Sequence, residues 1–354
     1  MKFSIKTNNV ENVLLVDGIT RTGKFLLAKI VSEFEDIEFF QSLPALEHIP
    51  YMFGLGGMSR DTAISLIKST IDYAAYDQFL GRGLNHRVLD RSSIYNSSDS
   101  ASYLKRQFEN LESNDILRLM RSNSKSFFFV THNILANVDI FLDAYPRLKM
   151  IYIVRNPVDL VYSWNRKEYG KVNSKDFLTM SPDIEKNGYS VPWYYSNWSD
   201  EYKKLGEIDL IVKSIKTILA LTAKKISSLS DIEKRKIHII RYEDLVTNPL
   251  NELKKVEVFL GKPINCQVKD ILLKEGLPNK SIVDKQEEKS KFIFDLTSEK
   301  YTKILKNMEL DYLNGDFKDS LYSKSQKIEG FEKQIFEKSN HFIDRKLLVD
   351  VLYS

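Results

Sequence analysis

Cysteine is almost absent from this chain of 354 residues, which contains only Cys266. A single cysteine cannot form an internal disulfide framework. The chain also has no cysteine pairs and no cysteine and histidine clusters with the spacing of a zinc site. We therefore expect a reducing compartment and no metal centre.

Long hydrophobic runs and a strong charge excess are lacking too. No run approaches the eighteen or so apolar residues of a membrane span, and residues 1–12 lack the apolar core of a signal peptide. Lysine and arginine exceed the acidic residues by 52 to 48, which is too even for the basic stripe of a nucleic-acid-binding protein. We expect a cytoplasmic protein with no transmembrane segment and no nucleic-acid partner.

What the chain does contain is a series of short apolar runs separated by helical patterns. The runs are nearly unbroken and bounded by polar residues, as expected for strands of a parallel sheet that is covered on both faces. This alternation predicts an α/β layered domain. The predicted strands are 13–17, 37–40, 126–131, 149–154 and 236–240, and the predicted helices are 23–35, 60–75, 99–122, 134–145, 157–168, 206–228, 249–260 and 298–309.

The same patterns predict the domain organisation. We place one α/β domain at 1–315, with a helical insertion at about 55–123. The stretch at about 168–205 is irregular and aromatic, and it either lines a substrate cleft or packs a loop on the core. At 316–354 a segment rich in lysine and glutamate predicts a helical extension, which packs on the body or mediates self-association.

The most informative segment is the loop after the first strand. Gly18 and Gly23 allow a tight turn, and apolar positions after Lys24 recur at helical spacing. Backbone N–H groups at such a helix start face an anion, helped by the helix dipole and by Arg21 and Lys24. The spacing nearly matches a nucleotide-triphosphate P-loop, but Phe25 stands where the magnesium-binding Ser or Thr is needed. A metal-dependent kinase is thereby disfavoured. An ordinary strand-to-helix turn with two glycines is the alternative interpretation of this segment.

A second landmark follows the strand at 149–154. Arg155 stands at its carboxyl end, where open α/β sheets bind ligands, and Ser163 lies in the helix that Asn156 and Pro157 begin. A guanidinium and a hydroxyl placed in this way can together hold a second phosphate. We expect Asp159 to support the helix N-terminus rather than to bind an anion.

Three separated motifs now resemble one family in the family's order. They are the loop at 18–24, the segment from Val154-Arg-Asn-Pro-Val-Asp159 to Ser163, and Arg241-Tyr-Glu-Asp-Leu-Val-Thr-Asn-Pro249 leading to Phe259-Leu-Gly261. Together they are similar to sulfotransferases that use 3'-phosphoadenosine-5'-phosphosulfate (PAPS). The resemblance spans roughly residues 12 to 261.

The resemblance implies a P-loop-like three-layer sandwich with a central parallel sheet of about five strands. It further implies PAPS as the co-substrate, transfer of a sulfuryl group to an acceptor hydroxyl or amine, and no required metal. The donor-binding residues that it implies are Gly18, Thr20, Arg21, Thr22, Gly23 and Lys24 of the loop, with Arg155 and Ser163 at the 3'-phosphate.

The loop departs from the family's usual Lys-Ser-Gly-Thr-Thr, because here it reads Arg21-Thr-Gly-Lys-Phe25. Arg21 is then the first choice for the cation that stabilises charge on the departing 5'-phosphate, and Lys24 is the alternative. The family's C-terminal glycine-rich nucleotide loop is not evident. The basic stretch 280–291 either replaces it or is a solvated charged loop.

Transfer to an alcohol needs a group that takes the acceptor proton. His132 follows the strand at 126–131, and a Thr-His pair stands at a similar place in cytosolic members of the family. Glu47 and His48 are the alternative bases, and His86 is a weaker candidate for acceptor contact. The two other histidines, His238 and His341, are expected to be structural.

Two functions of other classes compete with this prediction. One is an ATP-dependent P-loop kinase, and the other is a catalytically silent homologue that keeps the nucleotide fold for binding. The acceptor is not identified by the sequence, although the loop and the stretch 83–92 depart from the small-phenol enzymes of the family and favour a carbohydrate or glycoconjugate. Self-association through the C-terminal helix is a further hypothesis.

Overall fold

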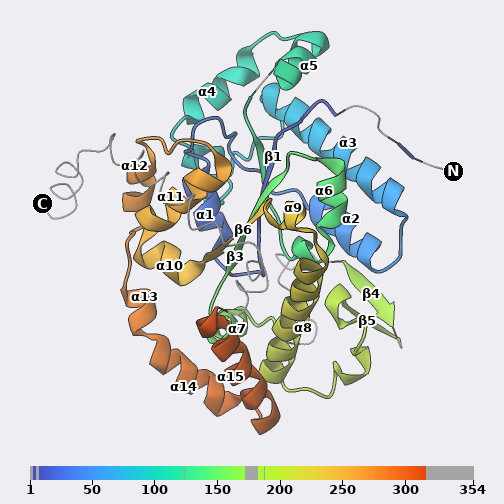
Figure 1. Ribbon diagram of the computed structural model, residues 1–354, viewed down its shortest axis with the longest axis vertical. Coiled ribbons are helices and arrows are strands. Elements are labelled where there is room, and N and C mark those ends of the chain that lie inside the picture. Colours follow the sequence, from blue (N-terminus) through green and yellow to red (C-terminus); the bar gives the residue numbers. More distant parts are fainter. Residues whose placement is uncertain (1–2, 5–7, 123, 172–181, 187, 316–354) are drawn as a thin grey trace, which may run out of the picture.

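The computed structural model describes residues 3–4, 8–122, 124–171, 182–186 and 188–315. The predicted extension at 316–354 lies outside these residues, as does part of the aromatic stretch. Within them, a parallel sheet is covered by helices on both faces (Figure 1). The predicted α/β layered fold is confirmed.

The sheet has four parallel strands in the order β2-β1-β3-β6. They are β1 (Val13–Asp17), β2 (Phe127–Val130), β3 (Lys149–Val154) and β6 (Ile237–Arg241). In register, Val16 pairs with Val130, Asp17 with Tyr152 and Val154 with Arg241. Because all four strands are parallel, their carboxyl ends meet at one edge, where ligands of such sheets bind.

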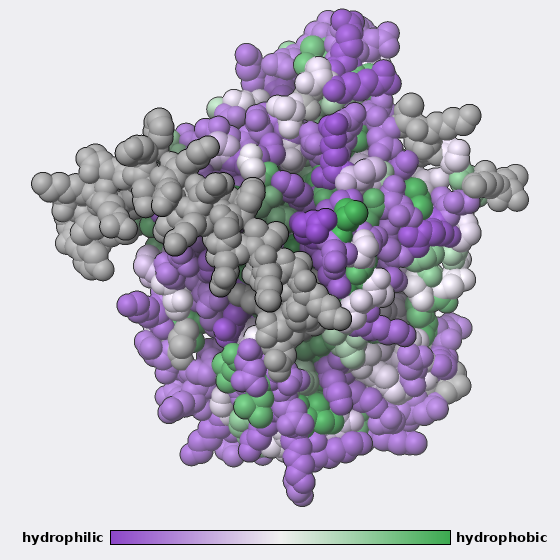
Figure 2. Space-filling model, in the orientation of Figure 1, coloured by the Kyte–Doolittle hydropathy of each residue, from purple (hydrophilic) through white to green (hydrophobic). Residues whose placement is uncertain are grey.

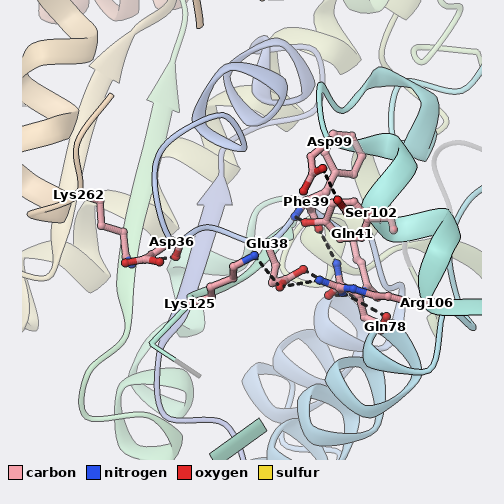
Figure 3. A network of polar contacts seen from close by, with 11 residues as sticks. Asp36, Glu38, Phe39, Gln41, Gln78, Asp99, Ser102, Arg106, Lys125 and Lys262 are labelled. Carbon is pink, nitrogen blue, oxygen red and sulfur yellow. Dashed lines mark hydrogen bonds and ion pairs between the residues drawn. The ribbon is translucent and has the colours of Figure 1, made fainter. Parts of the chain in front are cut away.

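The remaining predicted strand, 37–40, is reduced to two isolated parallel bridges beside β2, from Ile37 to Ser126 and from Gln41 to Phe129. Between them Glu38 is fully buried, with both terminal nitrogens of Arg106 at 3.1 Å and Lys125 at 3.5 Å (Figure 3). Burial alone would raise the pKa of Glu38, but the two cations outweigh it and hold the pKa below its usual range.

Strand side chains alternate between two cores. Leu15 and Phe127 face the helices α3 (Arg60–Phe79) and α8 (Glu207–Ser228), whereas Leu14, Phe128 and Ile151 face α1 (Lys24–Val31), α11 (Pro249–Leu260) and α12 (Val268–Lys274). Apolar residues on both faces explain why the predicted strands read as continuous hydrophobic runs.

Several helices differ from their predicted spans. The predicted helix 99–122 is broken into α4 (Ser100–Lys105), a 3-10 turn and α5 (Ser113–Ser122), and 134–145 becomes the 3-10 helix η3 (Ile134–Asn137) followed by α6 (Asp139–Ala144). The other helices are α2 (Ala45–Gly54), α7 (Pro157–Asn165), α9 (Asp231–Lys234), α10 (Tyr242–Thr247), α13 (Ser281–Asp284), α14 (Gln286–Leu296) and α15 (Glu299–Asn314).

The aromatic stretch contains a short antiparallel hairpin, β4 (Asp183–Lys186) and β5 (Tyr189–Pro192), beside α8 (Figure 1). After the hairpin, Trp193 and Tyr195 are only 4% and 2% exposed. The Trp193 ring stacks on Tyr51 of α2, with centroids 4.5 Å apart. These two aromatic residues pack on the core and do not line an open cleft.

The surface in Figure 2 is mostly hydrophilic, with apolar residues in small patches. Across the described residues, no helix combines the length and the apolar character needed to cross a membrane.

Candidate active site

The loop between β1 and α1 is held by two close approaches of the backbone. A Cβ on Gly18 would lie 2.5 Å from the carbonyl oxygen of Ile153, and one on Gly23 would lie 2.5 Å from the Tyr242 ring. Gly23 also has a φ of 98°, and Arg21 has a φ of 75°. Both predicted glycines are therefore required by the conformation of this loop.

Gly23 caps α1 without a side-chain hydrogen bond. The first N–H groups of a helix have no partner inside it, so this end of α1 offers backbone donors and the positive end of its dipole to an anion. The strand, glycine-bounded loop and helix start that the sequence predicts are present, and anion binding at this loop stays a prediction.

Three predicted residues converge at this helix start. Nε of Arg21 donates to Oγ of Ser163 at 3.2 Å, and Nη1 of Arg155 donates to the carbonyl oxygen of Arg21 at 3.0 Å. The guanidinium of Arg155 lies over the Tyr242 ring, 4.6 Å from its centroid, while its Nε is buried and has no hydrogen-bond partner among the described residues. Nε of Arg155 is therefore a buried donor whose hydrogen-bonding capacity is not satisfied by the described residues.

The two loop threonines act differently from each other. The carbonyl oxygen of Thr20 accepts a hydrogen bond of 2.8 Å from Nε1 of Trp164, which ties the loop to α7. Thr22 is 1% exposed, and its hydroxyl donates inward to the carbonyl oxygen of Ile19 at 2.8 Å. The hydroxyl of Thr22 therefore stabilises the loop, and its proton is not directed at a ligand.

Lys24 lies behind the loop. It is 2% exposed, and Nζ donates to the carbonyl oxygen of Ile19 at 2.8 Å. Burial lowers the pKa of Lys24 to about 8, against the opposing charges of Asp17 and Glu47. Arg21, by contrast, is exposed. Of the two predicted cations, Arg21 faces outward and Lys24 faces the core.

Asp17, at the end of β1, is the buried partner of this lysine. Burial raises the pKa of its carboxyl group to about 6, although Lys24 opposes the rise. The carboxylate accepts hydrogen bonds from the hydroxyl of Thr131 at 3.1 Å and from the backbone N–H of Leu135 at 3.0 Å. Asp17 thus joins the carboxyl ends of β1 and β2 beneath the loop.

His132 lies at the carboxyl end of β2, as predicted, and it contacts Glu47, which the sequence presented as an alternative base. Nδ1 of His132 is 2.8 Å from Oε1 of Glu47 in α2, and their side chains are 21% and 15% exposed. The Tyr51 hydroxyl donates to the backbone oxygen of His132. Burial and Lys24 lower the pKa of His132, and Glu47 acts against them. At neutral pH the imidazole is therefore mostly uncharged.

His48 follows Glu47 on α2, whereas His86 and His238 lie apart from this pair. His86 contacts the side chain of Gln107 at 3.1 Å, and its ring centroid is 6.1 Å from that of Tyr95. His238, in β6, stacks on Phe259 at 5.2 Å, in agreement with a structural role. His341 lies outside the described residues.

The basic stretch at 280–291 is not the solvated loop that the sequence favoured. It forms α13 and the start of α14, and α14 packs along α7, where the Phe292 and Tyr162 rings lie 5.8 Å apart. Nζ of Lys289 lies 3.0 Å from the fully buried carboxylate of Asp159. Asp159 thus binds a lysine as well as standing in the first turn of α7.

Tyr242 belongs to the third of the three motifs but was not among the predicted site residues. Tyr242 closes against Gly23 and carries the Arg155 guanidinium. Its position directly after β6, at the carboxyl edge of the sheet, was the available signal.

A cavity of about 340 Å³ adjoins this site between β3, α7, α8 and α15. Thr22 and Arg155 line one end of it, and apolar residues such as Leu219 and Met308 line much of the rest. Over the described part of the chain, no three His, Cys, Asp or Glu side chains gather in a metal-binding group.

Comparison with known proteins decides the family. A model of the sulfotransferase domain matches residues 14–347. The chain belongs to the sulfotransferase family. No curated protein matches its sequence.

Among solved structures, this sulfotransferase is similar to three others. A sulfotransferase domain from the curacin biosynthetic pathway is 15% identical, over 73% of this chain and 77% of that one, with a TM-score of 0.41. Sulfotransferase STF9 from Mycobacterium avium is 12% identical over 75% and 67%, with a TM-score of 0.36. A sulfotransferase from Alicyclobacillus acidocaldarius is 16% identical over 86% and 96%, with a TM-score of 0.33.

The family implies PAPS as the co-substrate, and the residues present fit it. PAPS carries phosphate groups at two positions, and the site offers cations and backbone donors to anions. Two observations within the described chain favour such a ligand. Nε of Arg155 is buried and unpartnered, and no side chain donates to or accepts from the start of α1 at its N-cap, Gly23.

Proposed function

We propose that this sulfotransferase binds PAPS with the loop 18–24, Arg155 and Ser163, and sulfates a hydroxyl of a carbohydrate or glycoconjugate. The observation that carries the proposal is the convergence of Arg21, Arg155 and Ser163 at the start of α1. Bound there, PAPS would supply an activated sulfuryl group on its 5'-phosphate. No bound metal is part of the proposal.

Arg21 is the cation that we assign to charge on the leaving 5'-phosphate. It is exposed at the outer side of the loop, whereas Nζ of Lys24 is buried and engaged with the carbonyl oxygen of Ile19. A fixed cation aimed at developing charge stabilises a transition state more than a ground state. Lys24 supports the loop from behind.

His132 is the base that we assign to the acceptor hydroxyl. If Nδ1 carries the proton that Glu47 accepts, then Nε2 has a free lone pair for the hydroxyl proton. It takes that proton as the new oxygen–sulfur bond forms and the bond between sulfur and the 5'-phosphate oxygen breaks. The imidazole becomes an imidazolium in this step, and the Glu47 carboxylate stabilises that charge. Glu47 is a positioning residue in this proposal, and not a competing base.

The lowered pKa of His132 suits this role. A base must be uncharged before it accepts a proton, and burial together with Lys24 keeps His132 uncharged at neutral pH. The carboxylate of Glu47 partly restores the basicity that burial removes. Replacing His48, the other predicted base on α2, by Asn is the matched control, and we expect it to retain turnover.

The acceptor class rests on the sequence of the loop and of residues 83–92, which differ from the small-phenol enzymes of the family. A cytoplasmic location is in keeping with the single cysteine, Cys266, which is free and exposed. Self-association through 316–354 remains part of the proposal, and it lies outside the described residues.

The first test is calorimetric titration with 3'-phosphoadenosine-5'-phosphate, the bisphosphate product, in the absence of metal. Micromolar binding is expected, and ATP with magnesium is the comparison ligand. Preference for magnesium-ATP, or binding of neither ligand, would overturn the donor assignment.

A panel of glycans, alcohols and phenols with PAPS then identifies the acceptor. Tight bisphosphate binding without sulfuryl transfer to any of them would favour the catalytically silent homologue.

A further inference from the structure

One surface segment of this sulfotransferase combines exposed apolar side chains with positive charge. Four large hydrophobic residues between positions 82 and 108 are exposed, by 69% for Val88, 89% for Leu89, 45% for Tyr95 and 86% for Phe108. Exposed side chains of this size cost free energy in water, so their concentration in one segment indicates an interaction surface.

The segment is also positively charged. Residues 82–108 contain five basic and two acidic side chains, a net charge of +3. Two of the basic side chains, Arg82 and Arg106, pair with Asp77 and Glu38 outside the segment. Arg87 and Arg91 flank the apolar pair Val88 and Leu89. Arg87 lies 3.6 Å from Asp90, and Arg91 is exposed.

Hydrogen bonds give the loop around this apolar pair a defined shape. The Asn85 side chain donates to Asp90 at 3.2 Å and to Ser92 at 2.9 Å, and its backbone oxygen accepts from the N–H of Ile94 at 2.8 Å. Ile94 is 1% exposed and anchors the loop in the core. The apolar pair is thus presented on a closed, anchored loop and not on a free coil.

Phe108 and Tyr95 lie near this loop. The amide of Gln107 contacts the His86 ring at 3.1 Å, and the ring of Tyr95 lies 6.1 Å from that of His86. The segment from 85 to 95 and the turn at 106–108 are therefore neighbours. Together they form one apolar and basic patch, which we define as Arg87, Val88, Leu89, Arg91, Tyr95 and Phe108.

We propose that this patch binds the surface of an anionic membrane, with Val88 and Leu89 entering the interface between headgroups and acyl chains. Aliphatic and aromatic side chains flanked by arginine are typical of segments that bind the membrane interface. The apolar side chains leave water, while the guanidinium groups stay at the phosphates of the lipid headgroups. The patch has six residues, whereas each side of a standard protein interface has roughly 20–30, and this difference favours lipid over a protein partner.

The patch borders the donor site. Leu84 packs in the same cluster as Phe25 and Tyr242. Burial raises the pKa of Tyr242, and the charges of both Arg155 and Arg91 act against that rise, so Arg91 lies within electrostatic reach of the residue that closes on Gly23. The inference does not depend on the proposed function, because membrane binding requires neither donor nor acceptor.

The test is co-flotation of the full chain with vesicles of phosphatidylcholine, with and without phosphatidylglycerol. We expect binding to the anionic vesicles, weaker binding at high salt, and little binding to phosphatidylcholine alone. The paired substitution Val88→Ser and Leu89→Ser should weaken binding about tenfold or more, and Arg91→Ala about fivefold.

Val258→Ser is the matched control, because Val258 is 63% exposed on α11 and lies outside the patch. Circular dichroism checks that each variant is folded. The proposal would be overturned if the Val88 and Leu89 variant bound the anionic vesicles as tightly as wild type. It would also be overturned if Val258→Ser weakened binding as much as that variant, or if wild type bound neutral and anionic vesicles equally. So would a dimer in solution that the Val88 and Leu89 substitutions dissociate, which would assign the patch to a second copy of the chain.

Discussion

The replacement Arg155→Ala tests the donor site without knowledge of the acceptor. Arg155 is half-buried, donates to the backbone oxygen of Arg21 at 3.0 Å and lies over the Tyr242 ring at 4.6 Å. These contacts orient the guanidinium, while its buried Nε has no partner in the described part of the chain. The substitution removes the orienting contacts and the free donor together.

The magnitude follows from the chemistry of the lost contact. A hydrogen bond to a charged group contributes about 1.5–3 kcal/mol, so the bisphosphate should bind roughly 10- to 150-fold more weakly to Arg155→Ala. Arg155→Lys should fall between wild type and Ala, because an ammonium keeps the charge but cannot donate to Arg21 and to a phosphate in the same fork geometry.

Calorimetric titration with 3'-phosphoadenosine-5'-phosphate measures the effect, and Arg147→Ala is the control. Arg147 is exposed just before β3, at the opposite end of the strand from Arg155, so its removal changes the net charge by the same amount away from the site. We expect the affinity of this variant to stay within about twofold of wild type. If Arg155→Ala bound the bisphosphate as tightly as wild type, or lost no more affinity than Arg147→Ala, the assignment of Arg155 to the donor would be wrong.

The remaining predictions concern the base and the stability of the fold. Glu47→Gln should lower kcat about 10- to 150-fold, because a charge-assisted hydrogen bond to the imidazolium is lost. The same variant should move the acid limb of the profile of kcat against pH to lower pH, because Glu47 raises the pKa of His132. Lys24→Met should move the same limb to higher pH, because Lys24 lowers that pKa; identical limbs in both variants would refute His132 as the base. Arg106→Ala should lower the free energy of unfolding by about 3 kcal/mol in urea titrations at pH 7, because the buried carboxylate of Glu38 loses the nearer of the two cations beside it. The folded-state pKa of Glu38 is lowered, so its contribution is present above the unfolded pKa and is lost as the pH falls through the folded value; a loss in Arg106→Ala that did not shrink at acid pH would contradict this.

The sequence predicted those parts of the site that strand ends determine. Arg155, His132 and the loop at 18–24 each follow an apolar run directly, and parallel pairing brings the ends of such runs to one edge. The contact between Glu47 and His132 could not be predicted in this way. The two residues are 85 positions apart, and their contact depends on how α2 packs beside η3, which no local pattern encodes.

Charge patterns were the least informative signals. The stretch at 280–291 reads as a solvated loop because its lysines and glutamates show no apolar stripe, yet Lys289 is needed at the buried carboxylate of Asp159. Likewise, the run 37–40 has the composition of a strand, but Glu38 requires Arg106 and Lys125 beside it. In both places a buried ion pair with a distant residue determines the structure, and periodicity does not report it.

The interaction between Asp17 and Lys24 explains how the loop tolerates its departure from the family pattern. A lysine in place of a small hydroxyl residue brings a charge into the core, and burial lowers its pKa to about 8. The carbonyl oxygen of Ile19 and the charge of Asp17 offset that cost. Burial also raises the pKa of Asp17 to about 6, and the charge of Lys24 opposes that rise. Because this pair lies behind the loop, it leaves Arg21 and the start of α1 facing outward. The altered motif therefore changes how the loop is supported and does not remove the cations from its outer face, which argues against loss of donor binding as the reason for the change.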